Sequence, residues 1–333
     1  MDLDLPLRIS GVGRYLPERV VHSRDLERRC GLPAGWAERR AGVITRRWAD
    51  PHRETAARMG AWAALEALED AGLGPRDLDL ILGASGTPQQ PIPDGAALIQ
   101  RELGLGASGI PAFSVHATCL SFLTALQVAA HLLASGTYRR ILVVSSEVAS
   151  VGLNFAQPES AVLMGDAAAA VVLERARLGH SSALLAARFE TYGDGAHLTE
   201  IRGGGSALPP LSPAARPEDF TFRMEGLRVL RMARDLSGAF LEALRPGLSQ
   251  GLAGLRAVVP HQASRAGLEL LSRYGWPERA VARTLPHLGN CVAASIPATL
   301  YDLLRSGEVQ RGDELLLVGT GAGFSMGGVI LRY

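Results

Sequence analysis

Two matching stretches decide the fold: LASG at residues 133–136 followed by ILVV at 141–144, and LRSG at 304–307 followed by LLLV at 315–318. Each pairs a helix-stop signal with a continuous apolar run, which is typical of a strand buried on both faces. The two copies lie about 171 residues apart. They predict a duplicated α/β unit, although ordinary helix-stop chemistry alone produces the same letters.

Along the chain, apolar runs alternate with stretches rich in Ala and Leu, a pattern typical of α/β folds with helices on both faces of a sheet. We expect helices at Thr55 to Ala71, Cys119 to Ser135, Leu227 to Leu244 and Ala293 to Ser306. We expect strands at Leu78 to Gly83, Arg140 to Ser145, Ala167 to Leu173, Ala257 to Val259 and Glu314 to Val318. The stretch Gly203 to Asp219 carries no period and predicts a surface loop.

The composition excludes several classes of protein. The 333 residues carry 34 basic and 33 acidic side chains, and every basic side chain is arginine. Without lysine, Schiff-base chemistry, Ser-x-x-Lys hydrolysis and a Walker P-loop are excluded. The balanced charge argues against nucleic acid or a membrane surface as partner.

Three widely spaced cysteines predict a reducing compartment, with neither a disulfide framework nor a metal knuckle. The first residues lack the layout of a signal peptide, and no apolar run reaches the length of a membrane span. These features predict a cytoplasmic protein.

The repeat also predicts which side chains meet. Carried back along the preceding helices, it places Cys119 opposite Asn290, and the earlier strands place Ala84 opposite His261. In a duplicated unit, Cys119, His261 and Asn290 would therefore gather at strand ends near a pseudo-twofold axis.

These residue types suit nucleophilic chemistry. A thiol at a helix start has its pKa lowered by unpaired backbone N–H groups, although a lone Cys among apolar residues is as often buried packing. His261 follows a buried strand directly, and Asn290 serves either as an N-cap or as a donor to a substrate oxygen. The small residues from Gly319 to Phe324 would let backbone N–H groups form an oxyanion hole.

Five spaced motifs resemble the ketoacyl-ACP synthase III family. They are ATC-LSF around Cys119, GD-A-AAAVVL at 165–173, PHQAS around His261, GN-x-x-AASIP at 289–297 and G-x-G-F-S at 321–325. The resemblance covers nearly the whole chain. It implies an α/β thiolase fold in five α-β-α-β-α layers, with halves at 1–176 and 177–333, assembled as a homodimer.

The resemblance also implies roles. Cys119 would take an acyl group from acyl-CoA or acyl-ACP, and His261 and Asn290 would hold malonyl-ACP or malonyl-CoA during decarboxylative condensation to a 3-oxoacyl thioester, without metal or cofactor. The backbone N–H groups of Cys119 and Ala322 would form the oxyanion hole. Substrate-binding positions would be Trp36, Arg40, Ile92, Gly226 and Ser264. Arg231 and Arg265 would dock the acyl carrier protein.

Three positions depart from the family pattern. Pro158 or Glu159 stands where a second adenine-clamping arginine is expected, Ser264 replaces an asparagine, and Ile92 replaces a bulky aromatic of the acyl pocket. A missing charge-assisted hydrogen bond to phosphate weakens coenzyme A binding by about 1.5–3 kcal/mol. We therefore expect a preference for acyl groups longer than acetyl, delivered on a carrier protein.

The sequence is also compatible with functions outside decarboxylative condensation, and each has a discriminating feature. A dinucleotide-binding Gly11-Val12-Gly13 fails because Leu16 stands at the third glycine position. A cysteine hydrolase would use His261 as the base, and a non-catalytic ketosynthase subunit would lack at least one of the three site residues. Within the family, acyl transfer to an alcohol or amine without decarboxylation is the alternative reaction.

Overall fold

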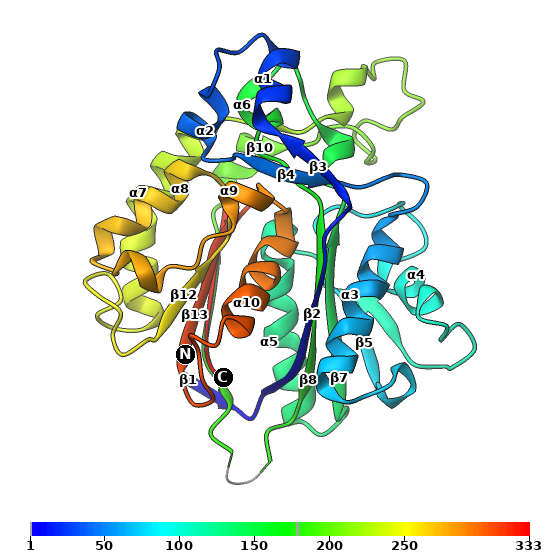
Figure 1. Cartoon of the computed structure of the whole chain (residues 1–333), viewed down its shortest axis with the longest axis vertical. Helices are drawn as coiled ribbons and strands as arrows, with labels where there is room; N and C mark the ends of the chain where they lie inside the picture. The colour runs from blue at the N-terminus through cyan, green and yellow to red at the C-terminus, as the bar shows by residue number, and fades with distance from the viewer. Residues whose placement is uncertain (1, 178–179) are drawn as a thin grey trace.

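Two five-stranded sheets enclose a central layer of helices (Figure 1). The computed structural model describes residues 2–177 and 180–333. The first sheet has the order β2 (Arg8–Tyr15), β8 (Ala167–Glu174), β7 (Arg140–Glu147), β5 (Leu80–Gly83) and β6 (Ala112–Ser114). The second has the order β1 (Asp2–Leu5), β9 (Ala183–Thr191), β14 (Ser325–Arg332), β13 (Glu314–Gly321) and β12 (Ala257–Pro260).

Helices α5 (Ser121–Ala134) and α10 (Ser295–Arg305) fill the space between the sheets and contact both of them. Helices α3 (Ala56–Ala71) and α4 (Gly95–Glu102) cover the outer face of the first sheet. Helix α7 (Gly226–Leu244) covers the outer face of the second and contacts α8 (Arg265–Leu270). These are the five layers that the resemblance to the ketoacyl-ACP synthase III family implies.

A cap of short elements lies over one end of the layers, at the top of Figure 1. It comprises β3 (Arg19–His22), α1 (Ser23–Cys30), α2 (Trp36–Ala41), β4 (Thr45–Trp48), α6 (Pro158–Ala161), β10 (Thr199–Glu200), β11 (Arg223–Met224) and α9 (Leu285–Leu288).

The four expected helices and five expected strands are present, with ends shifted by a few residues. Cys119 itself lies in a 3₁₀ turn, Thr118–Leu120, directly before α5. The stretch from Gly203 to Asp219 is irregular apart from one 3₁₀ turn beginning at Pro217. Strands β9 and β14 were not predicted, because the Ala-rich and Gly-interrupted runs that form them lack a clear β pattern.

The duplication is visible in the strand order. Strands β2-β8-β7-β5 correspond to β9-β14-β13-β12, with two antiparallel pairs followed by a parallel pair in each sheet. The Ala84 N–H donates to Val144 O at 2.7 Å, and the His261 N–H donates to Val318 O at 2.8 Å. The predicted equivalence of Ala84 and His261 is thus confirmed. The division of the chain at residues 176 and 177 stays a prediction, and β1 lies in the sheet of the second half.

The predicted equivalence of Cys119 and Asn290 is wrong by three residues. The Cys119 turn (Thr118–Leu120) corresponds to a second 3₁₀ turn, the Val292 turn (Val292–Ala294). Thr118 and Val292, their first residues, have positive φ angles of 50° and 47°. Helix α10 has 11 residues and α5 has 14, so a register counted back from the helix ends overshoots at their starts. The structural counterpart of Cys119 is Ala293.

Gly11 and Gly13 allow α3 to lie directly on β2. A Cβ atom at Gly11 would overlap the carbonyl oxygen of Ala67, and one at Gly13 would overlap that of Ala63. This close approach explains the glycine pair that the sequence offers as a weak dinucleotide motif.

We expect Gly13→Ala to lower the free energy of unfolding by at least about 1–3 kcal/mol, because backbone of α3 must move. Gly238→Ala, in α7 with no heavy atom within 4 Å of the new Cβ, is the control and should be neutral or stabilising. Urea unfolding of both variants tests this. Equal stabilities of the two variants would contradict the close-packing explanation.

Candidate active site

The Cys119 turn is held at the junction of the two halves. It packs against β13 and against the Val292 turn. The Ser121 Oγ accepts from the Ala117 N–H at 2.9 Å and donates to Thr118 O at 2.7 Å, which fixes the turn before α5 begins. On the opposite side, the Thr118 Oγ1 lies 3.3 Å from the carbonyl oxygen of Ala322, in the connection between β13 and β14.

Burial raises the pKa of the Cys119 thiol to about 12. The backbone N–H groups of Ala322 and of Cys119 itself act in the opposite direction, while the nearby Glu147 carboxylate adds to the increase. The sequence-based expectation of a lowered pKa is therefore wrong for the unliganded site, because desolvation outweighs the backbone donors. The role of the Cys119 and Ala322 N–H groups as an oxyanion hole stays a prediction.

His261 lies at the end of β12 beside Gly319 of β13. A Cβ at Gly319 would come within 2.6 Å of the His261 Cβ and 3.5 Å of the Leu120 side chain, so the imidazole lies close to the Cys119 turn. Burial lowers the pKa of His261 to about 4, so the ring is neutral at physiological pH. Its buried Nδ1 has no hydrogen-bond partner among the described residues.

The backbone around Asn290 sets the direction of its side chain. The Asn290 N–H donates to Leu163 O at 2.8 Å, and its Oδ1 accepts from the Val292 N–H at 2.9 Å. Its Nδ2 donates to the carbonyl oxygen of Ala263, two residues after His261, at 3.3 Å. One Nδ2 proton is thus used to join Asn290 to the His261 segment, and a second proton is left for a substrate.

Glu147, at the end of β7, is a site residue that sequence reasoning missed. Its fully buried carboxylate accepts from the N–H groups of Gly86 and Thr87 at 2.6 and 2.8 Å and from the Thr87 hydroxyl. The N–H of Ala293, in the Val292 turn, also acts to lower its pKa. Burial raises its pKa to about 7 against the effect of these donors. The carboxylate therefore ties the loop after β5 to the Val292 turn. The sequence does carry a signal that could have identified Glu147: it is an acidic residue at the end of an otherwise apolar strand.

Trp36 and Arg40, two of the predicted substrate-binding residues, lie on α2 in the cap. Glu27 fixes this helix by accepting from the N–H groups of Gly35 and Ala37 at 2.9 and 2.8 Å. Trp36 is half-buried in the apolar cluster of the cap, and Arg40 is exposed. Pro158 begins α6 at the position of the expected second arginine.

The other predicted substrate-binding residues lie in different surroundings. Gly226 begins α7. Ser264 is the N-cap of α8, where its Oγ accepts from the Gly267 N–H at 3.2 Å. Ile92, in the loop before α4, is 84% exposed. Their contacts with a substrate stay predictions.

Both predicted carrier-docking arginines are exposed. Arg231 lies on α7. Arg265 is less available, because it pairs with Glu269 at 2.6 Å and donates to the carbonyl oxygen of Arg39 at 3.1 Å.

Two further observations concern the part of the chain that the structure describes. Over residues 2–177 and 180–333, no three His, Cys, Asp or Glu side chains are grouped so as to hold a metal ion. None of the helices described there combines the length and apolar composition needed to cross a membrane.

Comparisons with known proteins identify the family of this chain. A family model described as 3-oxoacyl-[acyl-carrier-protein (ACP)] synthase III matches residues 113–193, and its C-terminal counterpart matches residues 251–333. A beta-ketoacyl-[acyl-carrier-protein] synthase III of Syntrophomonas wolfei is 32% identical over 99% of this chain and 98% of its own length.

Two solved structures are similar to this chain in both fold and sequence. The 3-oxoacyl-[acyl-carrier-protein] synthase III of Aquifex aeolicus superposes with a TM-score of 0.86 at 32% identity, covering 98% of this chain and 100% of its own. A priming beta-ketosynthase from the R1128 polyketide biosynthetic pathway gives 0.85 at 30% identity, covering 99% and 97%. The fold and site define a thiolase-fold acyltransferase. The chain belongs to the 3-oxoacyl-ACP synthase III family.

The lowered pKa of His261 predicts a pH-dependent stability. The folded state binds the His261 proton less tightly than the unfolded chain, so its contribution is complete above about pH 6.5 and is lost as pH falls toward 4. The stability of wild type relative to His261→Asn should fall by about 2 kcal/mol between about pH 7.5 and about pH 5. Urea unfolding at both pH values measures this. A constant difference would show that His261 is not buried as a neutral ring.

Proposed function

We propose that Cys119 is the acyl acceptor of this synthase. The observation that carries the proposal is the position of its half-buried thiol, where the backbone N–H groups of Cys119 and of Ala322 act to lower the pKa. As Sγ attacks a thioester carbonyl, these groups stabilise the developing oxyanion. The carbon–sulfur bond of the donor breaks, and the leaving thiol takes up the proton that Cys119 loses. The thiol thus stays neutral until a substrate carbonyl is present.

In the second half-reaction, His261 and the free Nδ2 proton of Asn290 donate to the carbonyl oxygen of a malonyl-type thioester. Loss of carbon dioxide leaves an enolate, whose carbon attacks the acyl group on Cys119 and expels the thiolate, which then takes a proton from solvent. Neutral donors suit this buried site because they stabilise the enolate without burying a further charge. The two half-reactions, as proposed, need no redox step, metal or cofactor.

The substrates we propose are acyl-CoA or acyl-ACP and malonyl-ACP or malonyl-CoA, entering beneath the cap past Trp36, Arg40 and Gly226. The start of α6 at Pro158 supports weak binding of coenzyme A, since it leaves the second arginine position without a cation. Of the two carrier-docking residues, Arg231 is the stronger candidate because Arg265 is already paired. The preference for acyl groups longer than acetyl and the cytoplasmic location remain predictions.

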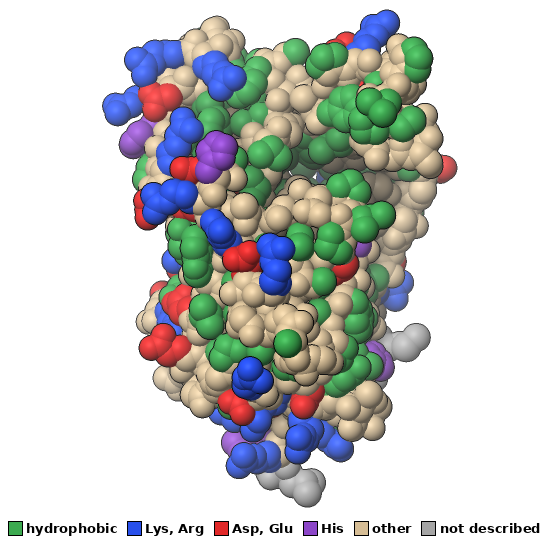
Figure 2. All heavy atoms as spheres, turned by 90° about the vertical axis from the view of Figure 1, so that its right-hand side faces the viewer, with side chains coloured by type: hydrophobic (Ala, Val, Ile, Leu, Met, Phe, Trp, Pro, Cys, Tyr) green, Lys and Arg blue, Asp and Glu red, His purple; other side chains and the backbone are tan. Residues whose placement is uncertain are grey.

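A homodimer is proposed from the edge of the first sheet. Strand β6 is paired on one side only, by β5, and its Phe113 is 42% exposed. The side chain of Ile92, in the loop after β5, is more exposed than that of Phe113, at 84%. Figure 2 shows hydrophobic side chains spread over the side of the molecule that carries α3 and α4. A second copy of the chain covering this edge would protect the unpaired side of β6. The Ile92 side chain of each copy would then contact the other copy.

Replacing Cys119 with Ala should abolish acyl labelling, because no nucleophile remains beside the oxyanion hole. Intact-protein mass after incubation with mixed acyl-CoAs and acyl-ACPs gives the readout. Cys30→Ala, which removes the half-buried thiol of α1, is the matched control and should label fully. A stoichiometric adduct on the Cys119→Ala protein would rule out the assignment.

Changes at His261 and Asn290 should separate the two half-reactions. His261→Ala, or Asn290→Asp, which keeps an acceptor for the Val292 N–H, should slow condensation by about 10²–10³ while Cys119 still becomes acylated. Acylation is followed by mass and condensation by carbon dioxide release. Equal loss of both steps would instead support His261 as the base of a hydrolase.

A further inference from the structure

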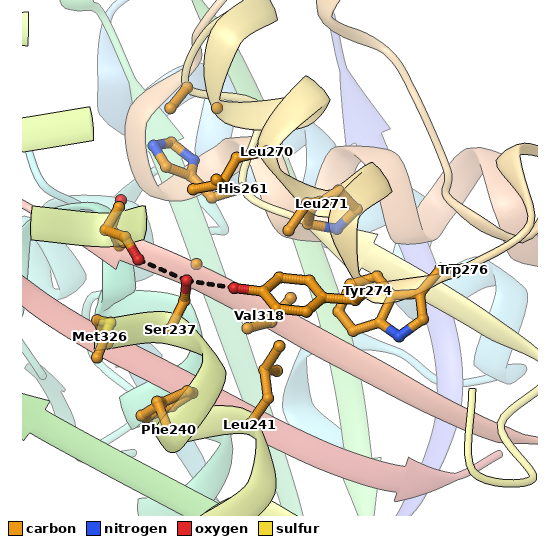
Figure 3. A pocket seen from close by; sticks show the side chains of 16 residues that line it. Ser237, Phe240, Leu241, His261, Leu270, Leu271, Tyr274, Trp276, Val318 and Met326 are labelled. Carbon is orange, nitrogen blue, oxygen red and sulfur yellow. Dashed lines mark hydrogen bonds between the residues drawn. The ribbon is translucent and has the colours of Figure 1, made fainter. Parts of the chain in front are cut away.

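A cavity of about 90 Å³ lies behind His261, on the side of the second sheet that faces α7 (Figure 3). Its walls come from α7, from α8 and the turn that follows it, and from the ends of β12 and β13. His261 forms one wall, so the cavity adjoins the proposed site for the extender. Nothing in the acylation of Cys119 uses this space.

The cavity suits an aliphatic group. Most of its lining is apolar, including Leu241, Leu270 and Val318. Three hydroxyl-bearing residues line it, Ser237, Tyr274 and Thr320. The hydroxyls of Ser237 and Tyr274 bond to each other, and Ser237 also bonds to the Ala233 carbonyl oxygen. The Ser237 and Tyr274 hydroxyls are therefore already engaged, and most of the remaining lining residues are aliphatic or aromatic.

Size and position together select the occupant. A volume of about 90 Å³ is several times the roughly 10–15 Å³ that a single water-sized group requires, so the cavity has room for a short chain of a few carbons. His261, which we propose holds the extender, lines this cavity, whereas no residue of the Cys119 turn does. A group carried by the extender is therefore closer to it than the chain on Cys119.

We propose that this cavity binds a short alkyl branch on the α-carbon of the extender, so that the enzyme accepts alkylmalonyl thioesters as well as malonyl. The inference rests on the proposed function and names a substrate class for it. Gly267 of α8 keeps the space open. A Cβ at Gly267 would meet nothing closer than 3.5 Å, so larger side chains fit the helix and reduce the cavity.

The experiment compares malonyl-CoA with propylmalonyl-CoA on the acylated enzyme, using mass spectrometry of the products. Wild type should condense both. Gly267→Val should slow the propylmalonyl reaction by about tenfold or more and leave the malonyl reaction within about twofold. Gly267→Ala, which adds one methyl group, is the matched control and should change both reactions little. Equal slowing of both reactions by Gly267→Val, or no propylmalonyl turnover by a wild type that uses malonyl-CoA, would overturn the proposal.

Binding is measured separately through Trp276, which lines the cavity. Propylmalonyl-CoA, but not malonyl-CoA, should change the tryptophan fluorescence of wild type, and both Gly267→Val and Trp276→Phe should abolish that change. A fluorescence change without condensation of either extender would refute the proposed function and leave the cavity assignment intact. No difference between the two ligands would refute the assignment of the cavity.

Discussion

The burial of α5 and α10 between the two sheets is the constraint on which the rest of the molecule depends. Helix α5 has a broad apolar face with seven buried apolar residues and a narrow polar stripe formed by Thr124, Gln127 and His131. So broad an apolar face needs cover from more than one side. Two sheets, one from each half, provide that cover. The 3₁₀ turns that lead into the two helices then have to meet, and the reactive side chains lie on these turns or just before them.

Within this junction the two halves differ in a way that serves the chemistry. Relative to the glycine that follows each helix, α10 begins three residues later than α5. The residues before the Val292 turn therefore stay outside the helix, and Asn290 can direct its amide toward the His261 segment. In the function we propose, one duplicated unit thus supplies a nucleophile in the first half and a donor in the second.

Charge is nearly absent from the site, which determines how it works. Burial keeps Cys119 protonated and His261 neutral, so both act as neutral groups until substrate arrives. Glu147 is the exception, and the donors of the β5 loop and the Val292 turn offset part of its desolvation. Its contacts hold the two halves in register beside Cys119, so one carboxylate links the fold to the geometry of the site.

The sequence by itself determined the principal helices and strands and the duplicated α/β unit, because apolar periodicity and repeated motifs are local signals. Its resemblance to the family implied the five layers and predicts Cys119, His261 and Asn290 as the site residues. The sequence did not determine the equivalence of Cys119 with Ala293, the raised pKa of the thiol, the role of Glu147 or the cavity behind His261. Each of these depends on distances between segments far apart in the chain, on desolvation, or on the volume left between packed helices. Those quantities exist only once the two halves have packed together.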